Sequence, residues 1–233
     1  MKTTLSRIWE SEATQKVPQA KGKEKNEGKI VRRRPPRFDL IAGNVALDFV
    51  NTLDDRYTKP KELLATYADL VRFAEDSGVL DSGKTDQLLE RGYMVADQTQ
   101  EILRRAKEMR EAIHDVFFAF LHKQPVPPAA LARLNAGAQT AAGHMHLLPG
   151  KQRFKWEFDN FGAWEAMLWP IARAASDLLA SDQLVFVRAC FSKTCEWMFL
   201  DTSKNHQRRW CDMTRCGNRA KVRRFYDRQK KSG

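Results

Sequence analysis

The most constraining feature of this chain is that all of its cysteines lie in one short segment. They are Cys190, Cys195, Cys211 and Cys216, so two C-x4-C pairs are separated by 15 residues. Each pair can close a tight chelate loop, and the intervening segment can bring the pairs together around one tetrahedral ion. Soft thiolates favour zinc, and four protein ligands leave no open position for catalysis. The spacing therefore predicts one structural Zn²⁺ ion, which would hold together a unit too small to fold by apolar burial alone.

Four thiols could instead form disulfides or hold an iron–sulfur cluster, and the rest of the sequence bears on these alternatives. The longest apolar run is six residues, Val116 to Leu121, whereas a membrane-spanning helix needs about 20. The first 20 residues include acidic side chains and lack the apolar core of a secretory signal. We therefore expect a cytoplasmic protein with no membrane partner, in which disulfides are disfavoured. An iron–sulfur cluster uses the same ligands and stays open as an alternative.

The net charge of +11 is concentrated at the two ends of the chain. Residues 1–37 contain 11 Lys and Arg and 4 acidic residues, and residues 188–233 contain 13 and 4. The middle of the chain is acidic, with 16 basic and 21 acidic residues. Attraction to phosphates is a local field effect that a distant acidic body would weaken. This distribution indicates that the ends meet an anionic polymer, although basic tails also serve solubility.

Composition and periodicity divide the chain into three segments. Residues 1–37 are lysine-rich and show no sustained periodicity, which predicts a disordered basic leader. Residues 38–181 are predicted to form a mainly helical domain with a small β-sheet, and residues 182–233 a second module that holds the cysteines. The predicted fold class is α+β, with a predominantly α-helical N-terminal domain.

Apolar spacing, glycines and prolines predict the elements of the helical domain. A short strand turns at Gly43 into a helix, and Pro60 starts an amphipathic helix that ends at Gly78. Further elements are two helices across 84–122, a short helix from Pro128 to Asn135, strands at 144–148 and 153–158, a helix over 161–181 kinked at Pro170, and a strand over 183–190.

Around the cysteines the sequence predicts a hairpin followed by a helix. Residues 196–201, E-W-M-F-L-D, are typical of a strand, and residues 206–210, H-Q-R-R-W, of a return strand that ends at Cys211. Residues 217–231 contain no proline and no internal glycine, which predicts a helix.

Basic side chains gather on this helix and in the segment before it. Helical spacing places Arg219, Arg223 and Lys230 on one face, together with Tyr226. Guanidinium forks and the N–H groups of a helix N-terminus suit phosphate oxygens. The candidate nucleic-acid contacts are Arg208, Arg209, Arg215, Asn218, Arg219, Lys221, Arg223 and Arg224.

The residues Cys216-Gly217-Asn218-Arg219 carry a family resemblance. The four cysteines, with the motifs W-M-F-L-D-T-S, R-R-W-C and C-G-N-R-A-K-V-R-R, resemble the CGNR zinc finger over about 40 residues. Upstream, L-D-F-V-N-T at 47–52 resembles the opening motif of the ABATE domain, which precedes this finger in bacterial proteins grouped as stress-induced transcription regulators. Together the two resemblances cover about residues 38–228.

The resemblance implies a treble-clef-like finger with the four cysteines as zinc ligands. It also implies DNA binding by the finger, and an N-terminal domain that senses a signal, such as a small-molecule effector, or mediates assembly. Within the upstream motif, Asp48, Asn51 and Thr52 are candidates for a small-ligand site or for structural helix caps.

The sequence contains no G-x-S-x-G, P-loop, G-x-G-x-x-G or H-E-x-x-H motif, and its thiols are assigned to zinc, so we do not expect an enzyme. The leading hypothesis is a DNA-binding transcriptional regulator whose finger contacts phosphates. The alternative is a protein-interaction or RNA-associated adaptor that docks the finger on an acidic partner, since a small zinc module serves either purpose.

Overall fold

The computed structural model describes residues 38–92, 94–159 and 162–232, and the predicted basic leader lies outside the described residues. The described residues belong to one compact unit. They are mostly helical with small sheets, as predicted. The helices are α1 (Val45–Val50), α2 (Tyr67–Asp76), α3 (Ser82–Gly92), α4 (Ala96–Leu121), α5 (Pro128–Gly143), α6 (Leu168–Leu179) and α7 (Asn218–Ser232). The strands are β1 (Leu53–Asp54), β2 (Lys61–Glu62), β3 (Met145–Leu148), β4 (Lys155–Phe158), β5 (Val187–Ala189) and β6 (Met198–Leu200).

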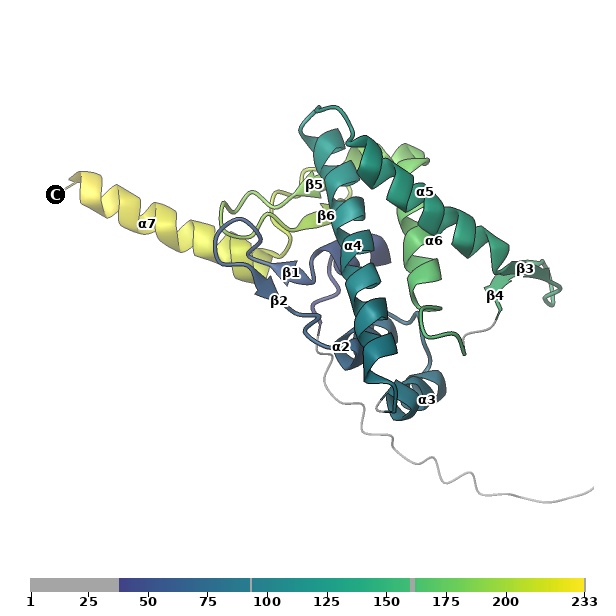
Figure 1. Ribbon diagram of the computed structural model, residues 1–233. Coiled ribbons are helices and arrows are strands. Elements are labelled where there is room, and N and C mark those ends of the chain that lie inside the picture. Colours follow the sequence, from purple (N-terminus) through teal and green to yellow (C-terminus); the bar gives the residue numbers. More distant parts are fainter. Residues whose placement is uncertain (1–37, 93, 160–161, 233) are drawn as a thin grey trace, which may run out of the picture. The chain divides into compact units, whose positions relative to one another are not determined.

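The long helix α4 organises the helical domain. Its apolar residues recur at helical spacing, and Ile102, Ala106, Ile113 and Phe117 are buried. Helix α4 contacts α1, α2, α5 and α6, and Figure 1 shows α5 and α6 beside it. The two helices predicted over 84–122 are confirmed as α3 and α4. No helix in the described ranges combines the length and the apolar character needed to cross a bilayer.

Helix α2 begins later than the sequence predicts. The chain first forms β2 and enters the helix only at Tyr67. Thr66 and Asp69 form a capping box, in which Thr66 Oγ1 accepts a hydrogen bond from Asp69 N–H at 3.2 Å and Asp69 Oδ2 accepts one from Thr66 N–H at 2.9 Å. The predicted start at Pro60 is wrong, because this reciprocal cap fixes the helix start at Tyr67, seven residues further on.

The segment before α1 turns without forming a strand. Gly43 has a φ of 75°, in the left-handed region that favours glycine. The carbonyl of Ala42 accepts a hydrogen bond from Leu200 N–H at 2.7 Å. The strand predicted before Gly43 is wrong, because the segment contributes this single carbonyl to β6 instead of a ladder of bonds.

Two prolines lie in first helical turns. Helix α5 begins at Pro128, as predicted, but continues to Gly143 instead of ending at Asn135. Helix α6 begins at Leu168, so Pro170 lies where a missing N–H leaves no intrahelical bond unmade. The predicted kink at Pro170 is therefore wrong.

The described strands form three antiparallel pairs, β1–β2, β3–β4 and β5–β6. The strands predicted at 144–148 and 153–158 are confirmed as β3 and β4, with Leu147 opposite Trp156. Strand β5 is shorter than predicted, because residues Asp182–Phe186 form a 3₁₀ turn before it.

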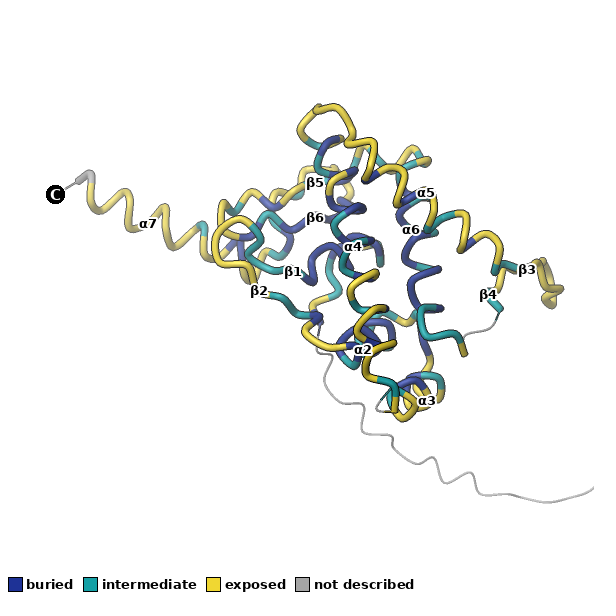
Figure 2. Tube along the Cα trace, viewed as in Figure 1, coloured by how far each residue is buried: buried dark blue, intermediate teal, exposed yellow. Residues whose placement is uncertain are grey.

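One hydrophobic core joins the helical domain to the cysteine module. It contains Phe49, Phe73 and Phe117 from the helices, and Phe199 and Cys216 from the module. Figure 2 shows α1 and β6 in the buried colour, whereas α7 is almost wholly exposed. The cysteine module therefore folds against the helical domain.

Candidate metal centre

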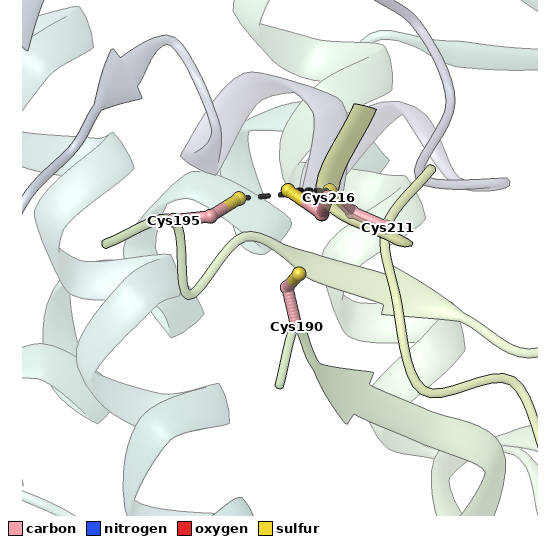
Figure 3. A group of neighbouring side chains, drawn as sticks. All are labelled: Cys190, Cys195, Cys211 and Cys216. Atoms are coloured by element: carbon pink, nitrogen blue, oxygen red, sulfur yellow. Dashed lines mark hydrogen bonds between the residues drawn. The ribbon is translucent and has the colours of Figure 1, made fainter. Parts of the chain in front are cut away.

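The four cysteine side chains converge from separate segments (Figure 3). All four are buried and unpaired as disulfides, and their sulfur atoms lie within 4.8 Å of one another. The Sγ atom of Cys211 is 3.5 Å from that of Cys195 and 3.6 Å from that of Cys216. A tetrahedral Zn²⁺ with Zn–S bonds of about 2.3 Å requires sulfur–sulfur distances of about 3.8 Å. The donor set and its spacing therefore fit one zinc ion.

The electrostatics of the cluster also favour a cation. Contacts with the Cys190 and Cys211 side chains, followed by burial, raise the pKa of the Cys195 thiol above its usual value. Contact with the Cys190 side chain likewise raises the pKa of Cys211. Neighbouring thiolates repel one another in a buried site. A divalent cation removes this repulsion, because it replaces the protons that the thiols would otherwise keep.

The first ligand pair is positioned by the β5–β6 hairpin. Cys190 directly follows β5, and its N–H donates to the carbonyl of Trp197 at 2.8 Å, which extends the ladder by one bond. Cys195 lies in the loop between the strands, where its N–H donates to Ser192 at 2.9 Å. Glu196 follows with a φ of 52°, so the chain reverses sharply into β6.

Asp201 shapes the segment between β6 and the second pair. Its buried carboxylate accepts hydrogen bonds from the N–H of Ser203 at 3.0 Å and the N–H of Arg208 at 2.8 Å. The carbonyl of Asp201 also contacts the His206 ring at 2.7 Å. These bonds bend the chain immediately after β6, so the return strand predicted at 206–210 is wrong, and β6 pairs with β5 instead.

The second pair leads directly into helix α7. The Asp212 side chain caps the turn that contains Cys216, accepting from the N–H of Arg215 at 3.2 Å and from that of Thr214. Helix α7 begins at Asn218 and confirms the helix predicted over 217–231. Arg219, in its first turn, places Nη2 3.1 Å from the Cys216 sulfur, and this contact raises the pKa of Arg219.

The three candidate nucleic-acid residues that precede α7 contact other parts of the chain. Arg208 donates from Nε to the Trp210 carbonyl at 2.9 Å, donates to the Cys211 carbonyl, and lies over the Phe199 ring. Arg209 lies over the Phe191 ring at 4.3 Å, and Arg215 forms a two-bond ion pair with Asp39. The other five candidates are exposed on α7: Asn218, Arg219, Lys221, Arg223 and Arg224.

Asn51 joins the helical domain to β6. Its amide Nδ2 donates to the Met198 carbonyl at 2.9 Å, and its Oδ1 accepts from the Met198 N–H at 3.0 Å. Both residues are buried. The side chain thus takes the place of a neighbouring strand on the edge of β6 that faces away from β5. The Ala42 carbonyl adds the next bond on this edge, to Leu200.

The other two candidates in the upstream motif are also hydrogen-bonded within the chain. Asp48 Oδ1 accepts from the Ala42 N–H at 2.9 Å, and burial raises the pKa of the Asp48 carboxyl to about 6. Thr52 Oγ1 donates to the Phe49 carbonyl at 2.6 Å and accepts from Arg110 at 3.2 Å. These contacts describe structural roles, and a small-ligand role for the motif stays a prediction.

Sequence reasoning missed the residues that fasten the cysteine module to the helical domain. Trp197 Nε1 donates to Asp54 Oδ1 at 2.7 Å, and Asp39 pairs with Arg215. An available signal was the buried polar residue Asn51 directly after α1, but its partner Met198 lies 147 residues away. The treble-clef-like arrangement of the module also stays a prediction.

Two family models match this chain. Residues 43–182, more than half of the chain, match the family described as "ABATE: Putative stress-induced transcription regulator", and residues 187–229 match the CGNR zinc finger. No curated protein matches the chain. The matches are to a regulator family and to a zinc finger, in the order that the sequence motifs indicated. With the four clustered thiols, they identify a zinc-binding finger that follows the ABATE region. The chain therefore belongs to the ABATE family and carries a C-terminal CGNR zinc finger.

Proposed function

We propose that this protein is a DNA-binding transcriptional regulator whose finger contacts the phosphate backbone through α7. The observation that carries the proposal is the exposure of this helix directly behind a zinc ligand. Helix α7 contains seven Lys and Arg residues and one acidic residue. All residues from Lys221 to Lys230 are exposed. A helix with this charge that covers no core is suited to a polyanion.

One face of α7 supplies a plausible contact surface. Arg219, Arg223 and Lys230, with Tyr226, line an open groove whose other wall includes Asp54. Arginine and lysine can neutralise phosphates along such a face. The groove therefore supports a contact that positions the protein on a nucleic acid backbone.

The contacts of the candidate basic residues support different proposed roles. We assign Arg208 to holding the backbone around Cys211 in place, because its guanidinium group donates to the carbonyls of Trp210 and Cys211. We do not assign Arg215 to the phosphate contacts, because a phosphate would have to displace Asp39 from its ion pair with Arg215. The proposed phosphate contacts are five exposed residues of α7: Arg219, Lys221, Arg223, Arg224 and Lys230.

Fluorescence anisotropy of the full-length, zinc-loaded protein with mixed-sequence duplex DNA tests this proposal. With about five phosphate contacts, log K should fall against log salt with a slope of about −4 to −5. The double variant Arg223→Ala/Arg224→Ala should bind more weakly and have a shallower slope, with its zinc content unchanged, because both side chains are exposed on α7 away from the cysteine sulfurs. The matched control Arg133→Ala/Arg173→Ala removes the same charge from α5 and α6, where Arg133 is exposed and Arg173 partly exposed, and should bind like wild type.

Two further arms separate the proposal from the alternative function. Duplex RNA of equal length and a polyglutamate peptide are titrated under the same conditions. The regulator is supported if the protein binds duplex DNA more tightly than RNA or the peptide, and if substitutions on α7 abolish this preference. Absence of DNA binding at low salt refutes it, and binding to RNA or to the acidic peptide alone identifies an adaptor.

A further inference from the structure

The segment F-K-W-E-F, which comprises Phe154 and strand β4, is chemically self-complementary. Read in opposite directions, it places aromatic opposite aromatic and lysine opposite glutamate. With two copies antiparallel and Trp156 opposite Trp156, Phe154 lies opposite Phe158 and Lys155 opposite Glu157. Directly opposed aromatic pairs and opposite charges are the contacts that stabilise neighbouring strands.

The backbone of β4 is arranged for this pairing. Among the described residues, β4 pairs only with β3, so its other edge has no strand beside it. The Asp159 N–H donates to His144 at 2.9 Å and the Gly150 N–H to Arg153 at 3.0 Å, on either side of the ladder. Because hydrogen-bonded pairs alternate in an antiparallel ladder, the N–H and C=O of Trp156 point to the open edge. If Trp156 faces Trp156 of a second copy, the N–H of each residue can therefore donate to the C=O of the other.

The side chains along this edge are exposed although they are apolar. Phe154 is 64% exposed, Trp156 61% and Leu147, its neighbour on β3, 51%. On the same face, Phe158 packs against the buried Trp169. An apolar face therefore begins at the core and continues onto the hairpin, where Figure 2 shows mostly exposed residues. Patches of this kind mark interaction sites, and an open strand edge is a template for pairing.

The charges on the opposite face select the partner and the register. Lys155 and Glu157 form an ion pair within their own strand, and both are substantially exposed, so exchanging partners costs little. In a parallel, in-register arrangement each charge would face a like charge. In an antiparallel arrangement with a displaced register, Lys155 and Glu157 would no longer face each other. A charged edge strand usually discourages pairing, but here the order of the charges complements the same strand in a second molecule.

We propose that β4 is a homodimerisation edge at which a second copy of this chain pairs antiparallel, centred on Trp156. The result is a four-stranded sheet in the order β3-β4-β4-β3, with two-fold symmetry. Such an interface is isologous, so a single sequence must complement itself, as F-K-W-E-F does.

Sedimentation equilibrium of the full-length, zinc-loaded protein at low salt tests the proposal, over about a hundredfold range of concentration. Wild type should show a monomer–dimer equilibrium. Lys155→Glu and Glu157→Lys should each weaken dimerisation by about tenfold or more, because each turns two attractive pairs into repulsive ones. Lys151→Glu, an exposed change of equal charge outside the paired segment, should dimerise like wild type.

Mixing the two charge-reversed variants provides the decisive arm. In a mixed pair every reversed charge meets its opposite, so heterodimers should recover the wild-type affinity, as should the double variant Lys155→Glu/Glu157→Lys. Circular dichroism and zinc content confirm that each variant is folded. A monomer throughout the series, a dimer indifferent to either reversal, or a mixture that stays monomeric would overturn the proposal.

Discussion

Replacing Asn51 with alanine removes the side chain that pairs with β6. Wild-type Asn51 makes two hydrogen bonds to the backbone of Met198, of 2.9 and 3.0 Å, in a buried environment. In Asn51→Ala the N–H and the C=O of Met198 both lose their partner, and water has little access to them because Met198 is 3% exposed. An unsatisfied buried polar group costs about 1–3 kcal/mol. We therefore expect the free energy of unfolding to fall by about 2–4 kcal/mol.

The assay is urea unfolding of the full-length, zinc-loaded protein, followed by tryptophan fluorescence. Asn44→Ala is the matched control, because Asn44 caps α1 with a single hydrogen bond to the Ala46 N–H and should cost about 1 kcal/mol. Asn51→Asp keeps the acceptor but sets a carboxylate oxygen against the Met198 carbonyl, so it should be at least as destabilising as alanine. If Asn51→Ala cost no more than Asn44→Ala, the inference that Asn51 completes the edge of β6 would be refuted.

Three further predictions concern the zinc ligand Cys216, the carboxyl group of Asp48 and the ion pair between Arg110 and Glu62. Cys216→Ser should abolish stoichiometric zinc, measured by atomic emission, and unfold the module, whose folding depends on metal binding of about 10–16 kcal/mol; a folded, zinc-loaded variant would contradict this. Because burial raises the pKa of Asp48 to about 6, wild-type stability should fall as pH rises from about 4 through 6, and Asp48→Asn should remove that loss. Its stability advantage in urea should be about 2 kcal/mol larger at about pH 7.5 than at about pH 4.5, and equal advantages would argue against the buried ionisation. Arg110→Met should destabilise by about 2 kcal/mol in thermal unfolding, because the partly buried Glu62 carboxylate loses two hydrogen bonds from Arg110, of 2.7 and 2.8 Å, and keeps the Leu64 N–H and the more distant Lys107. Adding Glu62→Gln should recover part of the loss, and additive losses would exclude the pairing.

The sequence was most informative where the determining forces are local. Helix α4 follows from apolar spacing, and the start of α5 from Pro128, because both depend on residues within a few positions. The zinc cluster was predictable for a different reason, since two closely spaced pairs of thiols supply the four ligands that a structural zinc ion requires. The family motifs then placed the finger and the domain before it.

The predictions failed where distant parts of the chain decide the local structure. Residues 206–210 were predicted to form a return strand after a turn, but Asp201 binds the backbone of Arg208 and diverts the chain. The partner of β6 is instead β5 on one edge and the side chain of Asn51 on the other. No periodicity encodes a contact between residues 147 positions apart. The short strands of this protein are fixed by tertiary contacts, which a local pattern does not contain.

The pairing of Asn51 with Met198 also bears on how such a finger can be moved between proteins. A finger transplanted into another protein without residues 42–51 would carry an open backbone edge, and a bare strand edge invites self-association. Grafts of this finger should therefore include a polar substitute for the missing amide, or retain the helix that supplies it. Chimeras that exchange the whole N-terminal domain would meet the same constraint. The incoming domain must place an asparagine, or a similar side chain, where it can hydrogen-bond to the backbone of Met198 on the open edge of β6.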